Sequence, residues 1–134
     1  MVATPTAAFT APIDLMTAQP ECETFTLPTG ARVFRRGSAA DAIYGVRRGI
    51  VELQGEEGEK TCYRPGELFS YRDIVWHQGL HHGDAVALTP VEVIRLDRLR
   101  FLNLVHNHPT LAILLIGQQH ERLREQRTSG TCCY

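Results

Sequence analysis

The sequence is poor in the features that mark several classes of protein. Its 134 residues include four cysteines and no C-x-x-C pair, which excludes a zinc ribbon and a disulfide-rich scaffold. The net charge of −1 gives no sign of binding to nucleic acid or anionic membrane. The longest apolar run, LAILLI, is too short to span a bilayer. The first residues lack the basic and unbroken apolar stretches of a secretion signal, so we expect a cytoplasmic protein.

The patterns that the sequence does contain predict one domain with a β-rich body and a helical C-terminal end. Residues 1–20, rich in Ala, Thr and Pro, predict a flexible arm with a short helix around Ile13–Met16. From residue 21, short β-branched and aromatic stretches alternate with Gly and Pro turns, which predicts a β-roll over 21–97. The apolar period then changes to 3.6 and predicts two helices over 98–127, capped by Asp97, followed by a tail over 128–134. The fold class is therefore mainly β, an antiparallel roll or jelly roll with flanking helices.

Three segments, in order, resemble the effector domain of the CRP/FNR transcription regulators, which has the cyclic-nucleotide-binding fold. GARVFRRGSAADAIYGVRRGIVELQ carries the pattern G-x-x-x-x-x-x-Y-x-V-x-x-G at Gly37, Tyr44, Val46 and Gly49. YRPGELF resembles the P-G-[DE]-x-F turn that leads into the ligand cassette. AVALTPVEVIRLDRLRFLNLVHNHPTLAILLIGQQHERL resembles the last strands, the B-helix and the dimerising C-helix.

The resemblance also implies where a cyclic nucleotide would bind, and the sequence departs from it there. In the family, a Gly-Glu pair and a later Arg-Ser/Thr pair hold the ribose and the cyclic phosphate. Aligned without a gap, these four positions hold Ser70, Tyr71, His81 and His82. A neutral imidazole does not replace a guanidinium fork. We therefore expect a domain that does not bind cyclic AMP, with a degenerate pocket at Ser70, Tyr71, Arg72, His81 and His82 and an unknown effector.

Three interpretations of this pocket remain open. Some relatives respond to 2-oxo acids, and such a small acid would be anchored by His81, His82 and Arg72. Alternatively, the pocket is filled by side chains such as Tyr71 and Trp76, and the domain is a ligand-free interaction module. The third interpretation is a metal-dependent, cupin-like enzyme that uses His77, His81 and His82, with Asp84 as the alternative to His82 for the third ligand. We predict no metal, since adjacent residues in an extended segment point to opposite faces, and no enzyme, since no nucleophile–base pair is evident.

The expected partners also follow from the resemblance. The C-terminal helix implies a homodimer, and a heptad-like seam runs along one of its faces. The seam consists of Ala112, Ile116, Gln119, Leu123 and Gln126. No helix-turn-helix fits in the residues after this helix, so we expect contact with DNA only through an absent or separate domain, and no contact with membrane.

Overall fold

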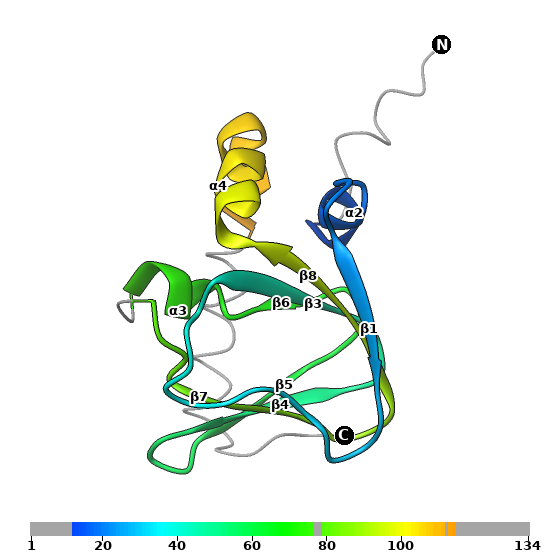
Figure 1. The fold of residues 1–134 in the computed structure, drawn as a ribbon, viewed down its shortest axis with the longest axis vertical. Coiled ribbons are helices and arrows are strands. Elements are labelled where there is room, and N and C mark those ends of the chain that lie inside the picture. The colour runs from blue at the N-terminus through cyan, green and yellow to red at the C-terminus, as the bar shows by residue number, and fades with distance from the viewer. Residues whose placement is uncertain (1–11, 77–78, 112, 115–134) are drawn as a thin grey trace.

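The computed structural model describes residues 12–76, 79–111, 113 and 114, and these form two packed antiparallel sheets with helices on the outside (Figure 1). One sheet has the order β1 (Glu23–Leu27), β8 (Val91–Asp97), β3 (Ala42–Arg48) and β6 (Leu68–Phe69). The other has the order β2 (Arg32–Phe34), β7 (Gly83–Ala87), β4 (Val51–Gly55) and β5 (Lys60–Tyr63). The predicted β-roll with flanking helices is confirmed. No helix in the described part of the chain is long and apolar enough to cross a membrane.

Strand β8 shows how the sequence pattern builds two cores. Its residues alternate between the two faces of the first sheet. Val91 and Val93 point into the space between the sheets, whereas Ile94 and Leu96 point toward the helices, and all four are buried. A strand buried on both faces reads as a nearly continuous apolar run, which is what VEVIRL contains.

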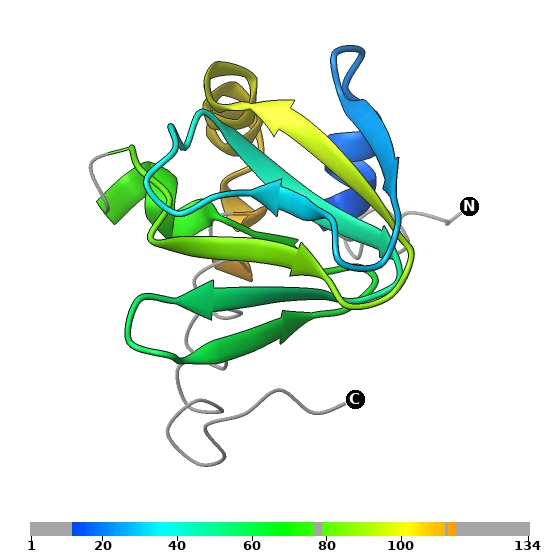
Figure 2. The ribbon, with the colours of Figure 1, turned by 60° about the horizontal axis from the view of Figure 1, so that its bottom comes forward.

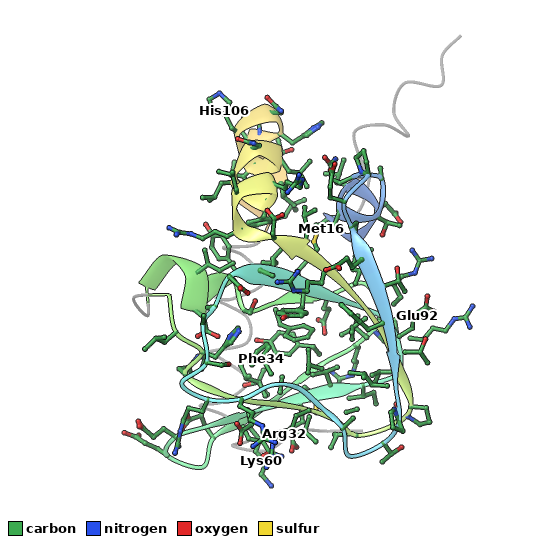
Figure 3. The ribbon with its side chains drawn as sticks, viewed as in Figure 1. Met16, Arg32, Phe34, Lys60, Glu92 and His106 are labelled. Atoms are coloured by element: carbon green, nitrogen blue, oxygen red, sulfur yellow. The ribbon has the colours of Figure 1, made fainter. Side chains whose placement is uncertain are left out.

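The core between the sheets is aromatic. Phe34 on β2 lies between the two sheets in Figure 3, with its ring centroid 5.4 Å from that of Tyr44. Phe69 lies 5.6 Å from Tyr44 and 5.2 Å from Tyr63. These tilted and stacked rings give the favourable geometry of aromatic pairs. The described residues thus place four aromatic rings inside the roll, and Tyr71 is not one of them.

Helix α2 (Pro12–Thr17) corrects one expectation. Ile13 and Met16 on this helix are buried and belong to the core under the first sheet. A flexible arm does not bury two large apolar side chains, so the prediction of an arm over residues 1–20 was wrong for this part, although the short helix was anticipated. Residues 1–11 lie outside the described part of the chain.

Helix α4 (Arg98–Asn107) begins where the sequence predicted. Asp97 is its N-cap, and its carboxylate accepts a hydrogen bond from the backbone N–H of Arg100 at 2.9 Å. Phe101 and Leu104 anchor the helix to the same core as Met16. Both α2 and α4 lie on the outer side of the first sheet (Figure 1). The second predicted helix lies largely outside the described residues. All five residues of the predicted dimer seam lie outside them.

Helix α3 (Tyr71–Trp76) was not predicted. It occupies the start of the histidine-rich segment, beside the end of the roll, as the rotated view in Figure 2 also shows. At six residues it is too short for the apolar period to identify it. It nevertheless positions the side chain on which the candidate site depends.

Candidate functional site

The site begins at an unusual backbone position between β6 and α3. Ser70 has a φ of 76°, and it is the one non-glycine residue with positive φ in the described ranges. This left-handed conformation favours glycine. The Ser70 hydroxyl offsets part of the cost by donating a hydrogen bond to the carbonyl oxygen of Ala42 at 3.0 Å. The ungapped alignment of the sequence analysis places the family's cassette glycine at this position.

The segment that carries the two histidines is fixed by backbone hydrogen bonds to the turn after β2. The N–H of His81 donates to the carbonyl of Ser38 at 2.9 Å, and the carbonyl of His81 accepts from the N–H of Gly37 at 2.8 Å. Ala39 and Leu80 form an isolated β-bridge in the same place. This pairing presses the imidazole of His81 flat against Phe34, with ring centroids 3.5 Å apart and planes 6° apart. His81 is therefore held at the edge of the aromatic core.

Asp73 on α3 joins the two histidines. Its Oδ2 lies 2.9 Å from Nδ1 of His81, and its Oδ1 lies 2.5 Å from Nδ1 of His82. Oδ1 also accepts a hydrogen bond from the backbone N–H of His82 at 3.3 Å. The side chains of Asp73 and His81 are 0% and 1% exposed, while that of His82 is 30% exposed. One buried carboxylate thus binds an imidazole on each of its oxygens.

The charge state of Asp73 follows from two opposing effects. Burial favours the neutral acid and raises its pKa, but the hydrogen bonds from His81 and His82, together with the electrostatic attraction to both side chains, lower it more, with a net result of about 2. The carboxyl is therefore ionised near neutral pH. The site contains a fixed negative charge at its centre, and the two histidines surround it.

The predicted pocket residues separate in the structure. His81 and His82 lie together, but Ser70 turns to Ala42, and the ring of Tyr71 packs edge-on against Phe101 at 5.9 Å in the core beneath the helices. Tyr71 therefore does not fill the roll, contrary to one interpretation of the sequence. The side chains of Arg72, Trp76 and His77 lie outside the described part.

Two points of the sequence analysis need correction at this site. The argument that His81 and His82 point to opposite faces was wrong, because both rings reach the same carboxylate; the chain is not an extended strand before Gly83. Asp73 was missed altogether. The one sequence signal for Asp73 is a carboxylate directly before the apolar residues Ile74 and Val75. Its separations of eight and nine residues from His81 and His82 match no known motif.

Asp84, named above as the alternative third metal ligand, belongs to a different contact. Its carboxylate accepts from the backbone N–H of Arg36 at 2.7 Å and lies 3.9 Å from the guanidinium of Arg32. Among the residues that the structure describes, no group of three or more His, Cys, Asp and Glu side chains is placed to hold a metal ion. His77 is not among those residues.

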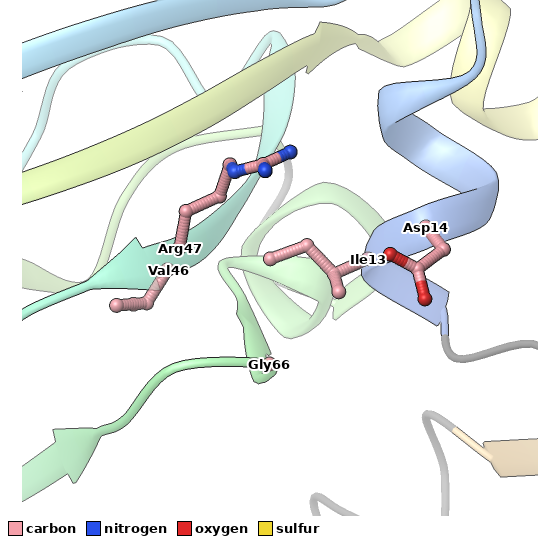
Figure 4. A pocket seen from close by; sticks show the side chains of 5 residues that line it. All are labelled: Ile13, Asp14, Val46, Arg47 and Gly66. Carbon is pink, nitrogen blue, oxygen red and sulfur yellow. The ribbon is translucent and has the colours of Figure 1, made fainter.

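Two surface pockets lie away from this cluster. The smaller, of about 200 Å³, is lined by Ile13 and Asp14 of α2, Val46 and Arg47 of β3, and Gly66 (Figure 4). The larger, of about 430 Å³, lies where β1 meets the start of α4. Its arginines are already paired, Arg95 with Glu23 and Asp41, and Arg100 with Glu21 and Asp97. Neither pocket includes a residue of the Asp73 cluster.

Comparison with known proteins identifies the fold family. The model of the cyclic nucleotide-binding domain matches residues 24–108 of this chain, from β1 to the end of α4. The chain belongs to the cyclic nucleotide-binding domain family. The cyclic AMP receptor protein of Thermus thermophilus is 32% identical to this domain over 103 aligned residues, and the match covers 73% of this chain and 47% of that protein. The domain thus spans about half the length of the curated relative it matches.

Solved structures agree with this assignment. The catabolite activator protein of Thermus thermophilus has a TM-score of 0.68 and 28% identity, over 87% of this chain and 55% of that one. The c-di-GMP responsive regulator CLP of Xanthomonas campestris has a TM-score of 0.73 at 18% identity, over 87% and 60%. The sensor domain of the regulator DNR from Pseudomonas aeruginosa has a TM-score of 0.63 at 22% identity, over 86% and 78%. CLP and DNR show likeness of fold alone. The family model and the Thermus relative confirm the predicted CRP/FNR-type effector domain.

Proposed function

We propose that this cyclic nucleotide-binding domain is the sensory part of a CRP/FNR-type transcription regulator that does not bind cyclic AMP or cyclic GMP. The kinship to CRP-type regulators supports the sensory role. The observation that carries the loss of nucleotide binding is the buried Asp73 carboxylate between His81 and His82. These histidines stand at the aligned positions of the Arg and Ser/Thr that hold the cyclic phosphate in the family.

The physical argument is electrostatic. A cyclic phosphate carries one negative charge, and its burial requires a cation or several hydrogen-bond donors. Here the Nδ1 atoms of both imidazoles are already engaged by Asp73, whose own charge is negative and buried. Like charges repel strongly where water is excluded. An anion at this place would therefore meet a carboxylate where the family supplies a guanidinium.

Equilibrium dialysis with labelled cyclic AMP and cyclic GMP tests the proposal. We expect no retention by the wild-type domain at micromolar nucleotide. A variant that combines Ser70→Gly, Tyr71→Glu, His81→Arg and His82→Ser restores the four family residues and provides the gain-of-binding control. Retention of either nucleotide by the wild-type domain at these concentrations contradicts the proposal.

The proposal extends to the partners. By the resemblance to the CRP/FNR regulators, we propose that the domain acts as a homodimer in the cytoplasm and contacts DNA only through an absent or separate domain.

A further inference from the structure

The smaller surface pocket is lined by an acidic and a basic side chain that do not pair with each other. Asp14 comes from α2 and Arg47 from β3, and both are exposed at this pocket of about 200 Å³ (Figure 4). Among the residues that the structure describes, every salt bridge joins other side chains. The arginines of the larger pocket, by contrast, are paired with carboxylates. The smaller pocket therefore offers one charge of each sign to a bound molecule.

A short chain of hydrogen bonds directs the guanidinium of Arg47 toward α2. The hydroxyl of Thr17 donates to the carbonyl oxygen of Ile13 at 2.7 Å, and its oxygen accepts a hydrogen bond from Nη1 of Arg47 at 3.4 Å. Thr17 lies three residues after Asp14, so the two are neighbours on one face of the helix, with Cβ atoms about 5–6 Å apart. A guanidinium has five N–H donors. Arg47 therefore keeps donors for a ligand beside the carboxylate of Asp14.

The rest of the lining is small and apolar. Gly45 lets α2 pack closely onto β3, because a Cβ at this position would lie 2.8 Å from Leu68 and 3.4 Å from Ile13. Gly66 adds no side chain to the opening, and its N–H is held by the carbonyl of Val46 at 2.8 Å. Sites for drug-sized ligands measure roughly 300 to 1,000 Å³. This pocket is smaller and fits a molecule of a few carbon atoms.

We propose that this pocket binds a free α-amino acid with a small aliphatic side chain. Arg47 binds the carboxylate of the ligand, Asp14 binds its ammonium group, and Ile13 contacts its side chain. Both charged contacts are charge-assisted hydrogen bonds, and a guanidinium matches the geometry of a carboxylate. A simple anion would meet the like charge of Asp14, and a simple cation would meet that of Arg47. The site goes beyond the proposed function, because it lies apart from the Asp73 cluster and depends on none of its properties.

Titration of the whole chain with L-valine tests the site, followed by the NMR signals of the Gly66 amide and the Arg47 side chain. We expect a saturable shift with a dissociation constant of about 1 mM, since the pocket is small and its charged groups are exposed. Isobutylamine is valine without the carboxylate, and isovalerate is valine without the ammonium group. Each should bind at least about fivefold more weakly. No saturable shift up to about 50 mM valine, or equal binding of either analogue, overturns the proposal.

Single substitutions assign the two charged contacts. Asp14→Asn and Arg47→Gln each remove one charge from an exposed position and should weaken valine binding at least about fivefold. Arg48→Gln is the matched control, because Arg48 is the next exposed arginine on β3, lies 3.5 Å from Glu92 and is not among the lining residues. It should leave the affinity for valine unchanged. Unchanged affinity in Asp14→Asn or in Arg47→Gln contradicts the proposal, and circular dichroism verifies that each variant is folded.

Discussion

At the scale of single residues, the alignment indicated that His81 and His82 lie near each other, but it did not indicate which side chain they contact. It placed His81 and His82 in one pocket, and the structure brings them together. It did not predict Asp73, because a contact between α3 and the segment before β7 depends on how the chain turns at Ser70 and not on any local period. The alignment also assigned Tyr71 to the pocket. In the structure, however, the first turn of α3 directs its ring toward Phe101.

The pKa of Asp73 predicts a pH-dependent contribution to stability. Its value falls from 3.8 to about 2 in the folded protein, so folding favours the ionised form. The contribution, about 2 kcal/mol, is complete above pH 3.8 and is lost as the pH falls toward 2. Chemical denaturation of wild type and Asp73→Asn from pH 6 downward should show a difference in unfolding free energy that shrinks below about pH 4. A difference that grows on acidification contradicts this account.

The positive φ of Ser70 predicts an unusual order of variants. Ser70→Ala keeps the left-handed strain and loses the hydrogen bond to Ala42, which should lower the unfolding free energy by about 1 kcal/mol. Ser70→Gly loses the same bond but relieves strain of about 1 kcal/mol, so it should be close to neutral. Thermal or urea unfolding compares the two. Greater stability of the alanine variant would show that the backbone is not strained here.

At the scale of elements, the sequence predicted helices and strands wherever the apolar pattern extended over enough residues to identify them. The β-rich stretch, which includes β3, β4 and β8, and the start of α4 at Asp97 were predicted correctly, since residue composition and a capping residue act locally. Helix α3 was missed because it has fewer than two turns. Helix α2 was underestimated because the burial of Ile13 and Met16 depends on α4 and the first sheet, which lie far along the chain.

The turn between β3 and β4 shows how tertiary packing adds to local geometry. Gly49 and Gly37 both have positive φ, at 83° and 85°. A Cβ at Gly49 would lie 2.3 Å from the carbonyl oxygen of Pro90, whereas a Cβ at Gly37 would meet nothing within 4 Å. Gly49 is therefore required both by its positive φ and by the close approach of Pro90, whereas Gly37 is required by its positive φ alone.

Alanine at these two glycines should separate the two effects. Gly37→Ala should cost about 1 to 2 kcal/mol of unfolding free energy, the penalty of the left-handed conformation alone. Gly49→Ala should cost roughly 2 kcal/mol more, because the backbone of Pro90 must move. Urea denaturation of the paired variants gives the difference. Equal losses would mean that the turn accommodates the methyl group freely.

At the scale of the whole molecule, the ordered series of short motifs was sufficient to predict the family, and the family match over residues 24–108 confirmed it. The cluster of Asp73, His81 and His82 was not predictable, because its side chains converge from α3 and the segment before β7. The domain spans about half of its curated relative. The regulation of transcription by the whole protein therefore remains a proposal.

The dimer also remains a prediction, since its seam over Ala112, Ile116, Gln119, Leu123 and Gln126 lies outside the described residues. Leu123→Asp should place two like charges across an isologous contact and convert the dimer to a monomer. Sedimentation velocity measures the mass, and circular dichroism verifies that the roll stays folded. A wild-type protein that is already monomeric at about tens of micromolar would refute the seam.

The central claim is that a carboxylate between two histidines has replaced the cyclic-phosphate site of this domain. Titration calorimetry of the wild-type chain with cyclic AMP at neutral pH and low salt tests it most directly, because low salt favours any binding of an anion. The account predicts no heat of binding beyond dilution. A saturable isotherm with a dissociation constant in the low micromolar range, weakened by His81→Ala, would contradict it.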